Sequence, residues 1–177
     1  MAASNESIFI AKGFDQVAFV VEDLEPATKL YSDLFGVERW SIWSDLAKDQ
    51  VNKTYRGEPG DFQFSCAYGY AGDILIELCH HDGGKSVYKD WLDTRGAGIH
   101  HVGFRVVDAN EFAEVERLYG KQGIEAAMGG ELTDVGRYIY FDTVDRIGCY
   151  TEIYHVTPAV AEMFERMKRG EVVEGPR

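Results

Sequence analysis

Four residues of metal-ligating type recur at matching positions in the two halves of the sequence. The repeat pairs residues 14–23 with residues 99–108, and residues 74–80 with residues 149–155. It sets Gln16 opposite His101 and Glu77 opposite Glu152. If the halves pack face to face about a pseudo-twofold axis, these four side chains converge on one point. One imidazole, one amide oxygen and two carboxylates form a donor set suited to an octahedral divalent metal ion.

A metal held by such ligands supports chemistry at a carbon next to a carbonyl group. It accepts one or two substrate oxygens and stabilises the enolate that forms when the neighbouring carbon loses a proton. The base must lie within hydrogen-bond reach of that carbon, and a carboxylate that alternates between metal and proton can serve. We therefore expect an enzyme that acts on a small-molecule carbonyl substrate.

The elements that must position these residues follow one order in both halves. Val17, Phe19 and Val21 alternate with Gln16 along a strand, and the strand that holds His101 is built in the same way. A helical pattern that ends at a glycine follows each strand, over residues 24–35 and 110–122. Further strands are predicted at residues 39–43, 63–70 and 73–79, and at residues 125–128, 138–142 and 150–154. Each half is thus a predicted βαβββ module.

These elements divide the chain into four segments. They are a first module (13–82), a connecting segment with a short helix (83–98), a second module (99–156), and a C-terminal helix and tail (157–177). The polar stretch at residues 44–61 is predicted as a long loop or lid. The C-terminal helix begins at Thr157-Pro158 and carries an apolar stripe, which is typical of core or dimer packing. A homodimer is the expected assembly.

Strand alternation also predicts which side chains line the pocket. The inward set is Leu75, Cys79, Arg105, Tyr150 and Tyr154, with Trp43 as a candidate lid contact. Arg105 is expected to pair with Glu77 or Glu152, or else to anchor a substrate carboxylate. The aromatic rings favour an aromatic or hydrophobic substrate. The other histidines are predicted at the surface, at positions 80, 81, 100 and 155.

Composition excludes several classes of protein. The net charge of −12 repels nucleic-acid phosphates and anionic lipid surfaces. The hydrophobic content of 45% predicts a folded globular protein. Three cysteines without Cys-x-x-Cys spacing favour a reducing compartment. With no apolar run long enough to cross a bilayer and no signal-peptide pattern, a cytoplasmic protein is expected.

Residues 13–156 resemble the vicinal oxygen chelate superfamily, which includes glyoxalase I, methylmalonyl-CoA epimerase, extradiol dioxygenases and bleomycin resistance proteins. The opening strand 15–24 and the strings 86–92 and 96–104 look like the family, and the last two look most like the methylmalonyl-CoA epimerase branch. The resemblance implies an α+β fold in which two βαβββ modules pair into one open-barrel-like site.

Carried over by position, the ligand order of glyoxalase I-like members falls on Gln16, Glu77, His101 and Glu152. The resemblance implies a divalent ion (Zn, Ni, Co, Mn or Fe), with Glu152 as first choice of base and Glu77 as second. Glutamine at position 16 disfavours a dioxygenase, whose sites resemble two histidines and one carboxylate. No glutamate stands at Asp61, Gln63 or Ser65, near the position of a second epimerase base.

The function expected from the resemblance is that of a metal-dependent isomerase or epimerase, which abstracts a proton alpha to a metal-bound carbonyl through an enolate. Two alternatives remain open. One is a glyoxalase I-like lyase, which uses the same metal and enolate chemistry. The other is a metal-free, bleomycin-resistance-like protein that binds a small molecule in the same cavity.

Overall fold

The computed structural model describes residues 14–176, and their strands form one ten-stranded mixed sheet. The strands are β1 (Phe14–Val21), β2 (Ser41–Trp43), β3 (Val51–Tyr55), β4 (Glu58–Pro59), β5 (Gln63–Ala71), β6 (Ile74–Gly83), β7 (Gly98–Arg105), β8 (Ala126–Leu132), β9 (Gly136–Phe141) and β10 (Tyr150–Val156). Their order across the sheet is β2-β5-β6-β1-β7-β10-β9-β8-β3-β4. The central pair, β1 and β7, is antiparallel and joins the two halves of the repeat.

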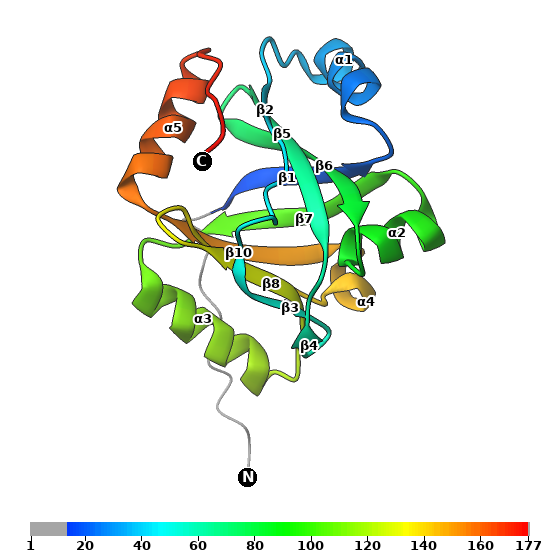
Figure 1. Ribbon diagram of the computed structural model, residues 1–177, viewed down its shortest axis with the longest axis vertical. Coiled ribbons are helices and arrows are strands. Elements are labelled where there is room, and N and C mark those ends of the chain that lie inside the picture. The colour runs from blue at the N-terminus through cyan, green and yellow to red at the C-terminus, as the bar shows by residue number, and fades with distance from the viewer. Residues whose placement is uncertain (1–13, 177) are drawn as a thin grey trace.

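Five helices pack on this sheet within the described residues. They are α1 (Leu24–Phe35), α2 (Val87–Arg95), α3 (Ala109–Lys121), α4 (Val144–Ile147) and α5 (Pro158–Lys168). The sheet curls, with α1 at the top of the view, α3 at the bottom and α5 beside β2 (Figure 1). The predicted α+β class is confirmed, and most predicted elements differ from the observed ones by only a few residues at each end. None of the five helices is long and apolar enough to cross a membrane.

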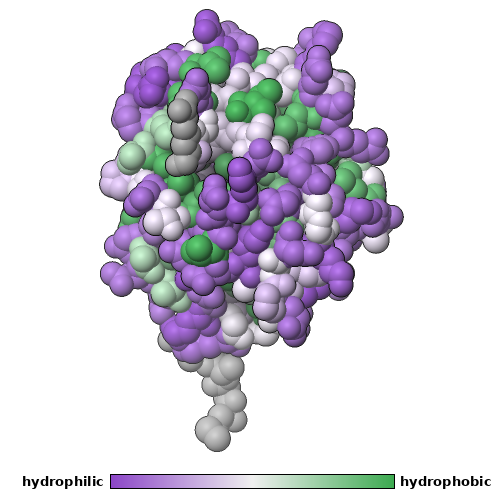
Figure 2. Space-filling model, viewed as in Figure 1, coloured by the Kyte–Doolittle hydropathy of each residue, from purple (hydrophilic) through white to green (hydrophobic). Residues whose placement is uncertain are grey.

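The two faces of the sheet bury different groups of residues. Helix α1 covers Phe19 and Val21, and helix α3 packs over Ile153 and Phe141, so these helices lie on the outer face. The inner face holds the largest apolar cluster, into which α2 sends Tyr88 and α5 sends apolar side chains of its predicted stripe. Figure 2 shows that hydrophilic residues cover most of one face of the molecule, as the acidic composition leads one to expect.

The main correction to the prediction concerns the stretch at 44–61. Residues 51–59 form the hairpin β3–β4, and β3 pairs with β8 of the second half. Arg56 and Gly57 both have positive φ, 47° and 82°, which is the backbone of a two-residue hairpin turn. Pro59 lies in the edge strand, where no partner needs an N–H group. Strands β3 and β4, from the first half of the chain, thus form the edge of the sheet next to the strands of the second half.

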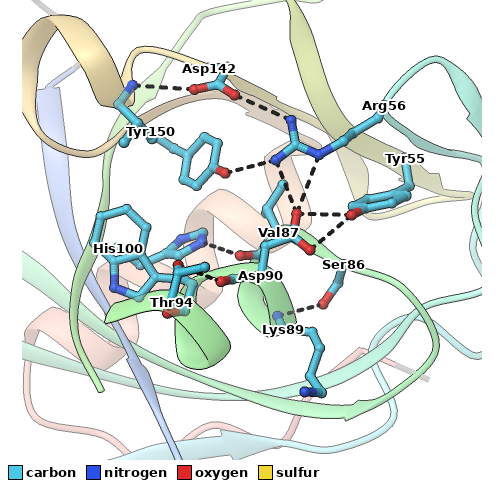
Figure 3. A network of polar contacts seen from close by, with 12 residues as sticks. Tyr55, Arg56, Ser86, Val87, Lys89, Asp90, Thr94, His100, Asp142 and Tyr150 are labelled. Atoms are coloured by element: carbon cyan, nitrogen blue, oxygen red, sulfur yellow. Dashed lines mark hydrogen bonds and ion pairs between the residues drawn. The ribbon is translucent and has the colours of Figure 1, made fainter. Parts of the chain in front are cut away.

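A network of polar contacts holds this hairpin against α2 (Figure 3). The Arg56 guanidinium donates to Asp90 at 3.0 Å and to Asp142 at 3.3 Å. Tyr55 donates its hydroxyl hydrogen to Asp90 at 2.9 Å. Because Asp142 follows β9, the turn is fastened both to the segment between the halves and to the second half.

Candidate active site and metal centre

The four repeated residues meet at one buried point on the inner face. The Nε2 atom of Gln16 lies 2.7 Å from Glu77 Oε2 and 3.0 Å from Glu152 Oε2. The Nε2 atom of His101 lies 3.1 Å from Glu77 Oε2 and 3.3 Å from Glu152 Oε2. All four residues are buried, with exposed fractions of 0–7%. The convergence expected from the repeat is therefore present.

Matching strand registers bring these side chains together. Glu77 on β6 pairs with Ala18 on β1, two residues after Gln16. Glu152 on β10 pairs with Gly103 on β7, two residues after His101. A Cβ atom on Gly103 would lie 2.9 Å from the Cβ of Gln16, so glycine leaves the room that the Gln16 side chain needs.

The two carboxylates differ in their readiness to hold a proton. Burial raises the pKa of Glu77, but the hydrogen bond and charge of His101 outweigh burial and bring that pKa below its ordinary value. Burial likewise raises the pKa of Glu152, and His101 offsets it only in part, so this pKa stays above the ordinary value. Burial lowers the pKa of His101, but the two carboxylates reverse this and raise it to about 9. Glu152 is therefore the stronger base of the pair.

The raised pKa of His101 predicts that the metal-free protein loses stability as the solution becomes alkaline. A histidine whose folded pKa exceeds its unfolded value of 6.5 stabilises fully below pH 6.5 and loses that effect as the pH rises through about 9. We expect the melting temperature to fall by roughly 5 °C between pH 6.5 and pH 9. Calorimetry at a series of pH values measures it. The His101→Ala variant should lack this component, and an equal fall in that variant would contradict the assignment.

His100 orients the His101 ring from behind. His100 is fully buried, which corrects its predicted surface position. Its Nε2 lies 3.3 Å from the carbonyl oxygen of Val87 at the start of α2, so this nitrogen must carry the hydrogen (Figure 3). Burial holds the pKa of His100 well below its ordinary value, which leaves its Nδ1 as an acceptor. The Nδ1–H of His101, 2.9 Å away, donates to it, so the His101 Nε2 faces the carboxylates.

This contact predicts that His100 controls metal affinity without touching the metal. A group that forms a hydrogen bond with the second ring nitrogen of a metal-bound histidine raises the affinity for the metal by about 10-fold to 100-fold. The His100→Leu variant removes the acceptor and is expected to bind a divalent ion that much more weakly. The His100→Asn variant keeps an oxygen acceptor and should stay within about threefold of the wild type. Titration with Zn²⁺ measures both, and equal losses in the two variants would contradict the orienting role.

A cavity of about 90 Å³ opens over the cluster, and Gln16, Glu77 and Glu152 form part of its wall. Two residues of the predicted pocket lining, Trp43 and Tyr154, also line it. The remaining wall is mostly aromatic and aliphatic: Leu46, Phe64, Tyr68, Leu132, Val135, Tyr138, Tyr140, Val156, Val160 and Phe164. The α5 stripe therefore covers this cavity within the chain.

Four predicted lining residues lie elsewhere. Arg105 pairs with Asp15 at 3.2 Å, rather than with Glu77 or Glu152, because Asp15 lies on the neighbouring strand β1. Tyr150 lies near Arg56 and His100, on the side of the cluster toward α2 (Figure 3). Leu75 and Cys79 are fully buried in the inner core and do not reach the cavity surface. Alternation put these residues on the inner face, but the curl of the sheet separates that face into distinct regions.

Several residues that line the cavity are not among the predicted lining residues. Tyr140 packs its ring against His101 with centroids 4.8 Å apart, and Tyr138 donates a hydrogen bond to Gln50 at 2.8 Å. Tyrosines at positions two apart on β9 were a usable signal, because alternation places them on one face. Gln50 had no such signal. His155, predicted at the surface, is half-buried at the end of β10, where it borders both this cavity and a groove beside α3.

The donor set fits a divalent metal ion. Glu77, His101 and Glu152 each offer one ligand atom, and these atoms lie within 4.8 Å of one another. The nitrogen and oxygen of the Gln16 amide can exchange places by rotation about one bond, which would turn the oxygen inward beside a cation. One imidazole, two carboxylates and an amide oxygen suit Zn, Ni, Co, Mn or Fe.

Comparisons with known proteins agree with this fold. A sequence model described as the glyoxalase/bleomycin resistance protein/dioxygenase superfamily matches residues 15–141. A crystal structure of methylmalonyl-CoA epimerase from Mycobacterium tuberculosis is similar, with 22% identity, a TM-score of 0.57, and coverage of 92% of this chain and 97% of that one. The hypothetical protein BH1468 from Bacillus halodurans is similar at 15% identity, with a TM-score of 0.55 and coverage of 80% and 92%.

A third similar structure is a Streptomyces coelicolor methylmalonyl-CoA epimerase in complex with 2-nitronate-propionyl-CoA, with 18% identity and a TM-score of 0.53. The match covers 82% of this chain and 94% of the epimerase chain. No curated protein matches the sequence. At these identities the likeness concerns the fold.

Proposed function

Since the chain belongs to the glyoxalase/bleomycin resistance protein/dioxygenase superfamily, we propose that it is a metal-dependent isomerase that moves a proton alpha to a carbonyl group. The buried cluster of Gln16, Glu77, His101 and Glu152 beneath an apolar cavity carries this proposal. These four residues would hold the metal. When bound, a divalent metal polarises a carbonyl oxygen and stabilises the charge of an enolate.

Glu152 is the proposed base. Its raised pKa brings it nearer to neutrality, where a carboxylate both accepts and returns a proton efficiently. Glu77 keeps a lowered pKa through His101 and suits the part of a permanent anionic ligand. The cavity wall within the described residues has these two carboxylates and no third.

A single base favours proton transfer on one face of the substrate. The strand β5, opposite Glu152 in the cavity, contributes Phe64 and Tyr68 to the wall rather than a carboxylate. Two-base epimerisation needs a second group on the opposite face, so isomerisation through one carboxylate is the better fit.

The decisive experiment has two steps. Elemental analysis of the purified protein should find about one divalent ion per chain after incubation with Zn, Ni, Co, Mn or Fe salts. The loaded protein is then given small alpha-oxygenated ketones in deuterium oxide, and NMR follows deuterium at the alpha carbon. Exchange with unchanged carbon skeleton supports an isomerase, and a product of different connectivity supports a glyoxalase I-like lyase. Failure to hold any of the five metals would overturn the proposal.

One observation favours a second candidate, a metal-free binding protein. The Gln16 amide nitrogen and the His101 imidazole both contact the two carboxylates, so Glu77 and Glu152 have partners without a cation. A metal-free protein that still binds an aromatic compound in the cavity would support this candidate. Cytoplasmic localisation and a homodimer stay predictions from the sequence.

A further inference from the structure

One buried donor in the wall of the cavity lacks a hydrogen-bond partner among residues 14–176. It is the amide nitrogen Nε2 of Gln50. Gln50 is only 9% exposed. A buried amide donor without an acceptor reduces stability, and native proteins keep few such groups. An unpaired donor in a cavity wall therefore indicates a site for a ligand with a hydrogen-bond acceptor.

The surrounding structure holds the Gln50 amide in place. The Tyr138 hydroxyl donates to Gln50 Oε1 at 2.8 Å, which anchors the oxygen and leaves the nitrogen as the free end. Gly130 makes room for this amide, because a Cβ atom there would collide with Gln50 Oε1. Tyr138 in turn packs edge-on against Phe64 across the cavity wall, with ring centroids 6.1 Å apart. The amide is thus a fixed polar group in an otherwise aromatic wall.

Charge limits what else can bind. Arg137 is the one lysine or arginine among the lining residues, and it already pairs with Glu116 at 3.2 Å and lies over the ring of Phe112. The net charge of −12 further disfavours a polyanionic ligand. No lining cation is left to bind the phosphates of a CoA thioester or the carboxylates of glutathione.

Size is the second limit. A cavity of 90 Å³ has room for a molecule of roughly six to nine non-hydrogen atoms, given the volume that one water occupies on this measure. Rings such as Trp43 and Phe164 favour a flat or apolar body through area burial and ring contacts.

We propose that Gln50 determines substrate specificity, and that the substrate is a short, uncharged, aromatic or alkyl carbonyl compound whose remote end carries an acceptor bound by the Gln50 amide. The reacting end of this substrate, at Glu152, rests on the function proposed above. The acceptor end rests on the geometry of Gln50 alone, so the two can fail separately.

The test compares two molecules of the same shape in the metal-free protein. Acetophenone has a carbonyl acceptor, and α-methylstyrene has a methylene group in its place. One hydrogen bond to a buried donor predicts that acetophenone binds about 10-fold more tightly to the wild type. In Gln50→Leu this preference should fall below about threefold, while the affinity for α-methylstyrene is unchanged. Ligand-observed NMR measures all of these affinities.

The matched control is Gln122→Leu, the same change at the exposed end of α3, which should keep the full preference. Gln50→Leu removes the unpaired amide nitrogen but also the acceptor of the Tyr138 hydroxyl, so the two effects oppose each other and its melting temperature should stay close to that of the wild type. An equal preference in wild type and Gln50→Leu overturns the inference, as does tighter binding of propionyl-CoA than of acetophenone. A Gln50→Leu protein that loses stability and binds neither compound assigns Gln50 a structural role and also overturns it.

The outcomes separate this inference from the proposed function. A protein that holds metal and exchanges deuterium, but has no Gln50-dependent preference, overturns only the specificity inference. A protein with that preference that never holds metal supports the Gln50 site and overturns only the isomerase.

Discussion

Glu152→Gln is expected to lower the rate of alpha-carbon deuterium exchange by about 1,000-fold, because positioned general bases contribute 100-fold to 10,000-fold. Glutamine keeps the size of the side chain and one oxygen that can face a metal, but it cannot accept the proton. Metal content should therefore fall far less than activity. NMR exchange rates and elemental analysis on the same preparation measure the two effects.

Two further variants sharpen this prediction. Glu77→Gln removes the carboxylate whose pKa is lowered, and it should weaken metal binding more than Glu152→Gln does. Glu165→Gln makes the same change on the exposed face of α5 and should leave both measurements unaltered. If Glu77→Gln abolishes exchange while the metal stays bound, and Glu152→Gln does not, the base has been assigned to the wrong carboxylate.

His101→Ala is expected to abolish metal binding and also to destabilise the metal-free protein by about 3 kcal/mol or more, the usual cost of removing one member of a buried charged group. The imidazole lies between Glu77 and Glu152, and it is completely buried. Without it the two carboxylates face each other with only the Gln16 amide between them. Denaturant unfolding in the presence of a chelator measures the stability, and titration with Zn²⁺ measures the affinity.

The control for this variant is His80→Ala, which removes a partly exposed histidine paired with Asp82. Exposed pairs contribute roughly 0–1 kcal/mol, so this change should be nearly neutral. A His101→Ala protein as stable as His80→Ala would show that the cluster carries no buried charge. A His101→Ala protein that still holds one metal per chain would place the metal elsewhere.

The candidate cluster was recoverable from the sequence because it depends on a repeat and on alternation. Residues at matching positions of two similar modules must occupy equivalent places, and period-two alternation assigns them a face. Helix limits were also well predicted, since α1 and α5 begin and end where their caps and proline indicate. Thr157 is the N-cap of α5, although its side chain donates to Asp134 instead of capping.

Other features depended on contacts between segments far apart in the chain. Strand β3 of the hairpin pairs with β8, and no local pattern in residues 51–59 predicts that pairing. Arg105 pairs with Asp15 because the curl of the sheet turns its side chain that way. His100 bonds to the Val87 carbonyl because α2 lies beside it. Gln50 joins the cavity only because Gly130 and Tyr138 accommodate its amide.

The sequence alone therefore determined which residue types recur and which side of each strand they occupy, because periodicity records local geometry. The tertiary structure alone decided which inner-face side chains reach the cavity, which of them are neutralised by partners, and which polar atom is left for a ligand. Those outcomes depend on the packing and hydrogen bonding of the whole chain, where many small free energies compete and none can be read from neighbours in sequence.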